Sequence, residues 1–371
     1  MNSRWLKRWR QIINAITRPA AGLGSRIVGR IFPWRLYGDP DAPLRPSNLR
    51  LLFIRSGGIG DSIIALGGLN AIALRYPGSV VDILGAADLA AVCEGLDFVG
   101  QIIPVHRLKR LTFFNAALRV LRSPRYDVVI DGYTPHDRIG FSTALIMAAS
   151  RARRRIGRSP KDLGRALTHL APPRGHGVHF VDEMFDVAEI VGVAPVSDRR
   201  PPIRLNPGEA DEAERVWSTV PGERPRVLIN IVAGHSSRHW DTDRYLEVAR
   251  HVRRLRPRAA IVVIGHGNEG DARTIAAAVG GVAISAAFRR IIGIVARADL
   301  VITPDTSISH IAAAFDRVVV SLHQSENYPW VPYRARGRAL FSTSFFTIRF
   351  IEVATVCDAV TEVLEREPEL R

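Results

Sequence analysis

Cysteine is nearly absent from this chain. The two cysteines, Cys93 and Cys357, lie far apart and form no C-x-x-C motif, and the first residues do not match a secretory signal. The sequence also has no short repeat and no long low-complexity tract. Disulfide scaffolds and structural zinc sites need closely spaced cysteines, so we expect neither here, and a reducing compartment fits the protein.

Lysine is scarce as well, because only Lys7, Lys109 and Lys161 occur among 51 basic residues. Against 36 acidic residues the basic ones give the chain a formal net charge of +15. Such an excess favours anionic partners, namely nucleic acid, an acidic membrane surface or phosphorylated substrates. Charge alone does not choose among these three.

Acidic residues are missing altogether from the first 38 positions, although eight basic residues occur there. On a helical projection, one face of this segment carries large apolar side chains, namely Trp5, Trp9, Ile12, Ile13 and Ile16. Apolar and basic faces on one helix predict that it lies in a membrane interface. The segment is too often interrupted by charge to span a bilayer. Two other interpretations stay open, a helix docked on its own protein and a disordered basic arm.

The rest of the chain suits two domains of typical size. In the first half, an apolar run at 49–55, helical spacing at 62–76 and a strand-like run at 80–84 form a βαβ unit. Further strands are expected at 101–105 and 126–131. The second half alternates in the same way, with strands in "PRVLINIVAG", "AAIVVIGHG", "DLVITPD" and "RVVVSLH". We therefore predict an α/β fold with a parallel sheet in each half.

The predicted organisation has five parts. An arm and linker occupy residues 1–48, and a first Rossmann-like domain occupies 49–190. A connector follows at 191–224, where the prolines of "APVSDRRPPIRLNPGEA" are expected to break any regular element. A second Rossmann-like domain covers 225–348, and 349–371 holds a final helix.

The first predicted strand runs into a turn that is rich in glycine and is followed at once by Asp61. Its glycines are Gly57, Gly58 and Gly60. A Rossmann G-x-G-x-x-G motif would need glycine where Ile63 stands, and the P-loop lysine is missing. What remains is a strand-to-helix turn where backbone can approach a ligand closely. From spacing alone, Asp61 as a helix cap is the simpler interpretation.

A second polar turn lies in "RADLVITPDTSISHIAAAF", at 297–315. A strand ends in Asp305, and small hydroxylated residues then open a helix. Backbone N–H groups at such a helix start attract phosphate, and Thr306 and Ser307 can add hydroxyl donors. We therefore expect a diphosphate as the ligand of this turn.

Taken with "IVAGHSSRHWDTDRYLEVARHV" from Ile231 and "VVIGHGNEGDART" from Val262, this order of elements resembles the bacterial heptosyltransferases of glycosyltransferase family 9. The resemblance covers residues 49–363. Its specific parts are the stretch at 305–310 and the Gly60–Asp61 turn, whereas the middle of each domain matches only in pattern.

The resemblance implies a GT-B architecture, in which two Rossmann-like domains with parallel sheets face a central cleft. The second domain would hold the donor, the first would hold the acceptor, and the final helix would pack back toward the first domain. The donor of the family is typically ADP-L-glycero-D-manno-heptose, which is transferred with inversion and without a divalent metal or other cofactor. The acceptor is the lipopolysaccharide inner core or a related glycolipid, made at the cytoplasmic face of the inner membrane. The implied partners are therefore a nucleotide sugar, a glycolipid and an anionic membrane surface, and nucleic acid is not among them. The implied location is the cytoplasm, with the protein bound peripherally to the membrane.

The resemblance also implies roles for single residues. Asp61 falls on the proposed general base. The implied donor-binding residues are Arg238, Glu269, Asp305, Thr306, Ser307, Ile308 and His310. Arg238 would meet the donor phosphates, the backbone at 306–308 would cradle the diphosphate, Asp305 would contact the sugar, and Glu269 would lie near the ribose.

Several of these positions depart from the family pattern or allow another interpretation. Ser307 stands where the family commonly has glycine, and Arg238 stands where lysine is frequent. "NIVAGHSS" replaces the usual Asn-Pro-Gly opening of its loop. For His310, a purely structural role is an open alternative.

Two further patterns could mislead. Asp241 and Asp243 form a D-x-D pattern, but they stand at the predicted start of a helix, where caps are expected rather than a metal site. The basic run at 151–165, "RARRRIGRSPKDLGR", lacks the aromatic residues that stack on nucleic acid bases. It is either a solvated basic face or a contact for phosphates on an acidic glycolipid.

Two classes of function follow. The leading one is an inverting, metal-independent glycosyltransferase that moves heptose from ADP-heptose, with another donor such as a UDP-hexose as its variant. The other is a basic protein that binds nucleic acid or anions without catalysis. Affinity for a nucleotide sugar favours the first, and salt-dependent DNA binding without nucleotide affinity favours the second.

The apolar face of the N-terminal segment yields a direct prediction. Its tryptophans and isoleucines should enter the bilayer while its arginines meet anionic headgroups. In liposome co-sedimentation, a chain that begins near Pro46 should therefore bind anionic vesicles more weakly than the full chain. Equal binding by the two chains would contradict the membrane role of this segment.

Overall fold

The computed structural model describes residues 28, 37–106, 110–132, 139–163, 165–172, 178–325, 330–367 and 370. Most of the predicted N-terminal arm, residues 1–27 and 29–36, lies outside the described residues. Within the described ranges, no helix is both long enough and apolar enough to cross a bilayer.

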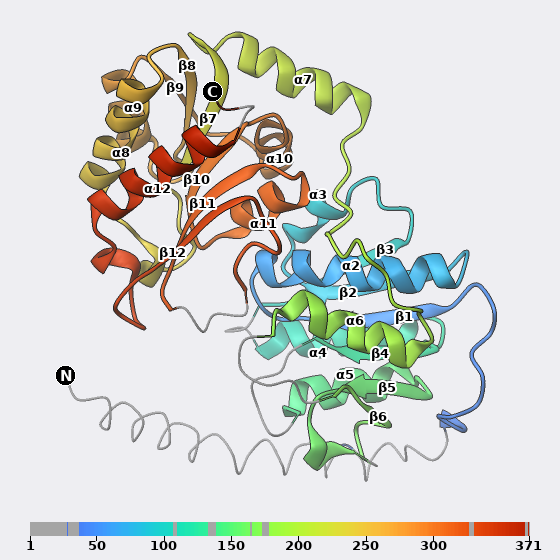
Figure 1. Cartoon of the computed structure of the whole chain (residues 1–371). Helices are drawn as coiled ribbons and strands as arrows, with labels where there is room; N and C mark the ends of the chain where they lie inside the picture. Colours follow the sequence, from blue (N-terminus) through green and yellow to red (C-terminus); the bar gives the residue numbers. More distant parts are fainter. Residues whose placement is uncertain are drawn as a thin grey trace.

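The first half is built on a parallel sheet with the strand order β3-β2-β1-β4-β5-β6 (Figure 1). Its strands are β1 (Arg50–Ile54), β2 (Val80–Gly85), β3 (Val99–Pro104), β4 (Val128–Asp131), β5 (Arg154–Gly157) and β6 (His169–Leu170). Alternate residues of β1 enter opposite cores, because successive side chains of a strand point to opposite faces. Leu51 and Phe53 pack with one helical layer, and Leu52 and Ile54 pack with the other.

Helices cover both faces of this sheet. The layer packed on Leu51 and Phe53 contains α2 (Ile59–Arg75), α3 (Leu89–Cys93) and α6 (Phe180–Val191). The layer packed on Leu52 and Ile54 contains α4 (Arg110–Arg122) and α5 (Phe141–Ser150). A short 3-10 turn, η2 (Pro160–Asp162), follows β5.

The second half repeats this plan with the strand order β12-β11-β10-β7-β8-β9. Its strands, all parallel to their neighbours, are β7 (Glu223–Asn230), β8 (Ala259–Ile264), β9 (Val282–Ile284), β10 (Leu300–Pro304), β11 (Val318–His323) and β12 (Gly337–Phe341). One face carries α7 (Pro207–Ser218), α10 (Phe288–Ala296) and α11 (Ser307–Ala314). The other carries α8 (Thr242–Leu255), α9 (Glu269–Ala278) and α12 (Val353–Arg366). The predicted α/β fold with a parallel sheet in each half is confirmed.

The connector differs from the prediction, because it contains a helix. Helix α7 begins at Pro207 in the first helical position, where proline loses no hydrogen bond and has a suitable φ. Asn206 and Glu209 complete a capping box, in which each side chain accepts a hydrogen bond from the backbone N–H of the other. The proline that was expected to break regular structure therefore starts it.

The final helix also differs from the prediction. Helix α12 buries Val356, Val360 and Val363 in the core of the second half, against α8, β11 and β12, rather than packing toward the first domain. The Trp240 indole donates a hydrogen bond of 3.1 Å to the carbonyl of Ile351, which lies just before α12. This bond holds the segment before α12 against the second half of the molecule.

The two halves meet where α2 contacts α11 (Figure 1). A Cβ atom on Gly60 of α2 would lie 2.8 Å from Cδ2 and 3.2 Å from Nε2 of His310 on α11. Glycine is therefore needed at position 60 for the imidazole to seat against α2. Ile63 of α2 and Ile311 of α11 belong to one continuous buried cluster, so the contact is apolar around the histidine.

A second contact joins the segment around Val331 to the start of α6. The Nδ1 atom of His179 accepts a hydrogen bond from the backbone of Val181, so its Nε2–H donates to the carbonyl of Val331 at 2.7 Å. The Tyr333 hydroxyl donates to Asp182 at 2.8 Å. These bonds fix the second half on α6 as well as on α2.

Burial of His310 should make the stability of the protein depend on pH. The ring is 4% exposed, and this burial lowers the pKa of His310 from its ordinary value of 6.5 to about 4. Between these values the unfolded chain binds a proton that the folded chain does not, so acidification lowers the free energy of unfolding. At pH 5 the loss from His310 is about 2 kcal/mol.

A His310→Gln variant should therefore lose about 2 kcal/mol less stability than the wild type between pH 7 and pH 5, measured by urea unfolding. Leu74→Gln, which replaces an exposed side chain that does not titrate, should keep the wild-type dependence. An equal loss in His310→Gln and wild type would show that the buried ring does not control acid stability.

Candidate active site

Polar residues gather at the carboxyl edge of the second sheet. Asn230 ends β7, His323 ends β11, and Asp305 and Thr306 directly follow β10. These strands are parallel, so their carboxyl ends lie at the same edge. In open α/β sheets, this edge is where ligands bind.

The start of α11 is fixed by hydrogen bonds to the neighbouring strand. The Asn230 amide donates to the hydroxyl oxygens of Thr303, at 2.9 Å, and Thr306, at 3.2 Å. Thr306 is the N-cap, and its oxygen also accepts from the backbone N–H of Ile308 at 3.3 Å. In both of these bonds the Thr306 hydroxyl oxygen is the acceptor, and its role as a hydrogen-bond donor to a phosphate stays a prediction. The backbone of Ser307 and Ile308 forms the first turn of α11, whose N-terminus carries partial positive charge.

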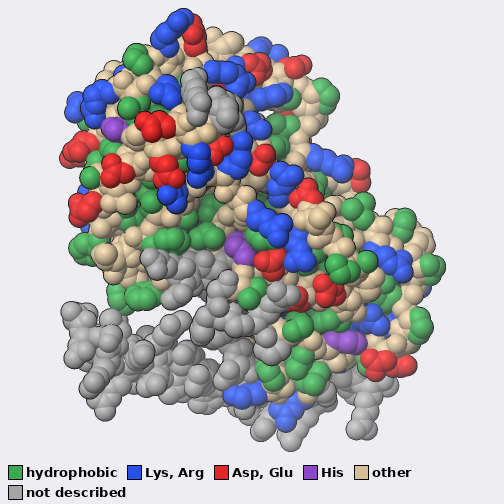
Figure 2. Space-filling view, viewed as in Figure 1, with side chains coloured by type: hydrophobic (Ala, Val, Ile, Leu, Met, Phe, Trp, Pro, Cys, Tyr) green, Lys and Arg blue, Asp and Glu red, His purple; other side chains and the backbone are tan. Residues whose placement is uncertain are grey.

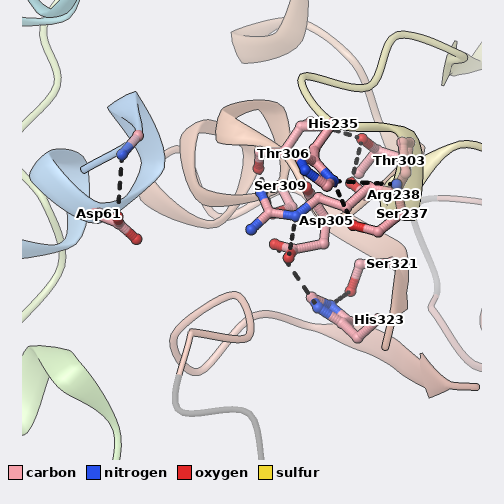
Figure 3. A network of polar contacts seen from close by, with 12 residues as sticks. Asp61, His235, Ser237, Arg238, Thr303, Asp305, Thr306, Ser309, Ser321 and His323 are labelled. Carbon is pink, nitrogen blue, oxygen red and sulfur yellow. Dashed lines mark hydrogen bonds and ion pairs between the residues drawn. The ribbon is translucent and has the colours of Figure 1, made fainter. Parts of the chain in front are cut away.

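Asp305 is a buried carboxylate paired with Arg238 (Figure 3). The Arg238 Nε atom lies 3.1 Å from Oδ2 of Asp305, and its Nη1 donates to the Asp305 carbonyl at 3.1 Å. The Asp305 side chain is 4% exposed and that of Arg238 is 34% exposed. Arg238 is thus held by a buried partner while part of its guanidinium stays accessible beside the start of α11.

His323 lies on the other side of Asp305, with its Nδ1 atom 3.9 Å from Oδ1. Burial lowers the pKa of His323 to about 3, and the nearby charge of Arg238 acts in the same direction. The ring is therefore neutral at pH 7, and its Nε2 is hydrogen-bonded to Ser321 at 2.8 Å. The positive charge that faces Asp305 comes from Arg238 rather than from this histidine.

Glu269 is the first residue of α9, which follows the loop after β8. Its carboxylate accepts hydrogen bonds from the backbone N–H of Gly267, at 2.9 Å, and from the Ser285 hydroxyl, at 3.0 Å. The Gly267 bond is the main cause that lowers the pKa of Glu269. Strand β8 adjoins β7, which adjoins β10, so Glu269 lies at the same edge as Asp305 but two strands away.

Asp61 lies in the first turn of α2, on the other half of the molecule. Its Oδ2 accepts a hydrogen bond from the backbone N–H of Gly58 at 3.1 Å, so the predicted helix-cap contact is present. The same oxygen lies 3.1 Å from Nη2 of Arg55. Arg55 is 4% exposed and Asp61 is 29% exposed, so the pair anchors an accessible carboxylate on a buried cation.

The glycine turn is closely surrounded by side chains of the protein itself. A Cβ atom on Gly57 would lie 2.2 Å from the Asp61 carboxylate, and one on Gly60 would meet His310. Only Gly58 faces open space, with no atom within 4 Å of its ideal Cβ. Two of the three glycines therefore leave room for neighbouring side chains of the protein, and close approach of a ligand to this turn stays a prediction.

His310 connects the two sets of residues. Its ring contacts Gly60, the residue before Asp61, and the charges of Asp305 and Asp61 both act on its titration. Its Nδ1 atom is buried and has no hydrogen-bond partner among the described residues. The structure therefore places His310 in the packed contact between the halves, whereas the resemblance counted it among the donor-binding residues. Figure 3 shows Asp61 on α2 facing the network around Asp305.

In the D-x-D pattern, Asp241 makes contacts within the protein. Asp241 is the N-cap residue of α8 and lies 3.7 Å from both Arg244 and Arg349. Among the residues that the structure describes, no three His, Cys, Asp or Glu side chains are grouped as metal ligands would be.

The basic run at 151–165 holds the linker that follows the N-terminal arm. Arg153 donates to the carbonyl of Pro43 at 2.7 Å, and Arg154 donates to that of Pro40 at 3.3 Å. Arg155 is buried and lies 5.8 Å from the ring centroid of Tyr37. Much of this run is thus structural, which neither sequence interpretation foresaw. On the face in Figure 2, basic and acidic side chains are interspersed over the second half and form no continuous basic stripe.

The sequence patterns did not indicate Arg55, Asn230 or His323 as site residues. Each stands at or just after the carboxyl end of a buried parallel strand, which is the signal that could have indicated them. The contacts of Asn230 with Thr303 and Thr306 join residues that are distant in the sequence. Asp61, in contrast, follows Arg55 closely, and Ser321 lies two residues before His323.

The family model of glycosyltransferase family 9 (heptosyltransferase) matches residues 115–344. No curated protein sequence matches the chain. Among solved structures, the chain resembles a glycosyl transferase of family 9 from Veillonella parvula DSM 2008, with a TM-score of 0.70 and 17% identity over 88% of this chain and 99% of that one. It also resembles the E. coli ADP-heptose lps heptosyltransferase II, with a TM-score of 0.64 and 18% identity over 86% and 99% of the two chains.

A third similar structure is the E. coli heptosyltransferase WaaC with ADP, with a TM-score of 0.63 and 16% identity over 85% and 98% of the two chains. WaaC is also known with ADP-2-deoxy-2-fluoro heptose. At these identities the structures establish the fold, which is the GT-B architecture. The family model spans more than half of the chain, and the protein therefore belongs to glycosyltransferase family 9.

Proposed function

We propose that this protein is an inverting, metal-independent glycosyltransferase that moves heptose from ADP-heptose to a lipopolysaccharide core or related glycolipid. The observation that carries the proposal is the position of Asp61. This accessible carboxylate on the first half faces the helix start and Arg238 of the second half across the contact of α2 with α11 (Figure 3). An inverting displacement needs a base and a site for the leaving diphosphate on opposite sides of the sugar.

On the donor side, the backbone N–H groups of Ser307 and Ile308 meet the diphosphate at the positive end of α11. Arg238 adds a charged donor, and its anchoring by buried Asp305 fixes the direction of the guanidinium. Glu269 contacts the ribose from the start of α9. Positive groups held in place before the reaction stabilise the charge that develops on the leaving diphosphate. The ligands of WaaC, ADP and an ADP-sugar, support this assignment of the donor.

On the acceptor side, Asp61 takes the proton from the attacking hydroxyl. A bond forms between the acceptor oxygen and the anomeric carbon as the bond from that carbon to the β-phosphate oxygen breaks. The anomeric carbon is thereby inverted, and ADP leaves toward α11. Arg55 positions the base, because its buried guanidinium holds the Asp61 carboxylate at the first turn of α2.

The proposed acceptor is a glycolipid, so the reaction takes place at a membrane surface. The basic, apolar segment at the start of the chain would hold the protein at the cytoplasmic face of the inner membrane. The net charge of +15 fits both this surface and phosphorylated parts of the acceptor.

The donor assignment predicts ADP binding without added metal. Calorimetric titration with ADP, UDP and GDP in the presence of a chelator should give the tightest binding for ADP. Arg238→Gln should weaken ADP binding by about 1–3 kcal/mol, because a charge-assisted hydrogen bond is lost. Arg290→Gln, which replaces an arginine of α10 that is paired with Glu212 of α7, is the matched control and should bind ADP normally. A requirement for a divalent ion, or unchanged affinity in Arg238→Gln, would contradict this assignment.

The base assignment predicts that Asp61→Asn lowers turnover by about 100-fold or more, with ADP affinity retained. The single variant leaves the buried Arg55 cation without its counter-charge, which also destabilises the fold. The double variant Arg55→Gln/Asp61→Asn removes both charges and should regain stability while it stays inactive. If the double variant regains turnover with stability, Asp61 has only a structural role.

A further inference from the structure

Helix α4 exposes large apolar side chains on the first half. Leu111 is 77% exposed, Phe114 is 54% exposed and Leu121 is 43% exposed. Leu111, Phe114 and the half-buried Leu118 follow one another at spacings of three and four residues, so they share the outward face of the helix. The opposite face, with Ala116, Ala117 and Val120, is buried against the sheet. Exposed apolar residues in such a stripe mark an interaction surface.

Positive charge borders this apolar stripe. Arg122 is exposed on the outward face of α4, one turn beyond Leu118, and it has no ion-pair partner among the described residues. Arg119 is fixed by two hydrogen bonds to the Gln101 side chain, at 2.7 and 3.1 Å. Together with Leu118, the two arginines line an open hollow on the surface. Residues 98–126 contain no Asp or Glu, so nothing in this stretch opposes the charge.

The N-terminal segment joins the protein in the same layer. Val28 is 1% exposed and lies in the core cluster beneath α4 and α5. The Tyr37 hydroxyl donates a hydrogen bond of 3.0 Å to the carbonyl of Ala148 on α5. Val28 and Tyr37 are therefore attached to the layer that carries α4 and α5.

We propose that the outward face of α4 is a second membrane-binding surface, which places Leu111, Phe114 and Leu118 in the interface of an anionic bilayer. Arg119 and Arg122 meet the lipid phosphates beside them. A helix with an apolar stripe bordered by basic residues binds in the plane of the interface in this way. The proposal concerns how the protein is held on a membrane and does not depend on its proposed reaction.

Charge decides among the possible occupants of this face. The N-terminal segment has no acidic residue up to position 38, so docking it on α4 would bring like charges together. A second copy of the chain would likewise oppose its Arg119 and Arg122 to those of the first. An anionic lipid surface supplies both the apolar medium and the negative charge that the face lacks.

The test uses the full chain and co-sedimentation with vesicles of phosphatidylcholine and phosphatidylglycerol in a two-to-one mixture. Leu111→Gln/Phe114→Gln should lower the partition coefficient by about tenfold or more. Arg122→Gln should lower it by about fivefold at low salt and less at high salt. The matched control is Leu74→Gln on α2, in the opposite layer, where the leucine is 73% exposed. It should bind vesicles as the wild type does.

Hydrogen exchange locates the contact without relying on the variants. Amides of residues 110–122 should gain protection when vesicles are added, and those at the end of α2 should not. Unchanged partition in Leu111→Gln/Phe114→Gln would overturn the proposal. So would protection of α4 without vesicles that is lost in Trp5→Gln/Trp9→Gln, because the N-terminal segment would then be the occupant. Protection that rises with protein concentration in the absence of lipid would assign the face to a second copy of the chain instead.

Discussion

The contact between Gly60 and His310 is the constraint on which the arrangement of the site depends. It brings α2 and α11 together at the point where each helix begins, because Gly60 precedes Asp61 and His310 follows Asp305 by five residues. The buried, neutral ring has little tolerance for displacement, since a single added methyl group on α2 would already clash with it. The spacing between the carboxylate of one half and the helix start of the other is thus set by packing.

Each half anchors an accessible charge on a buried one. In the first half, Arg55 is buried and Asp61 is partly exposed, whereas in the second half Asp305 is buried and Arg238 is partly exposed. A buried charge needs its partner, because the cost of leaving it unpaired is several kcal/mol. The pairs therefore fix the position of the carboxylate and of the guanidinium without removing them from solvent.

Helix starts and strand ends were predictable, because the groups that form them are adjacent in the chain. The apolar strands of both sheets and the polar turn after β10 could be read directly. Among the prolines of the connector, Pro207 was misjudged, because it is harmless in the first turn of a helix that Asn206 caps. The arginines at 151–165 were misjudged because their acceptors, carbonyls near Pro40 and Pro43, lie more than a hundred residues away in sequence.

The sequence by itself determined the alternation of strands and helices, and with it the two parallel sheets, because hydrophobic periodicity is a local property. It also determined Asp61, Asp305 and Thr306 as residues at the start of helices. Only the tertiary structure decided that Arg55 anchors Asp61, that His310 is a packing residue between the halves, and that α12 stays on the second half. These contacts depend on the distances between elements that are remote in the chain, and those distances are set by packing of the cores.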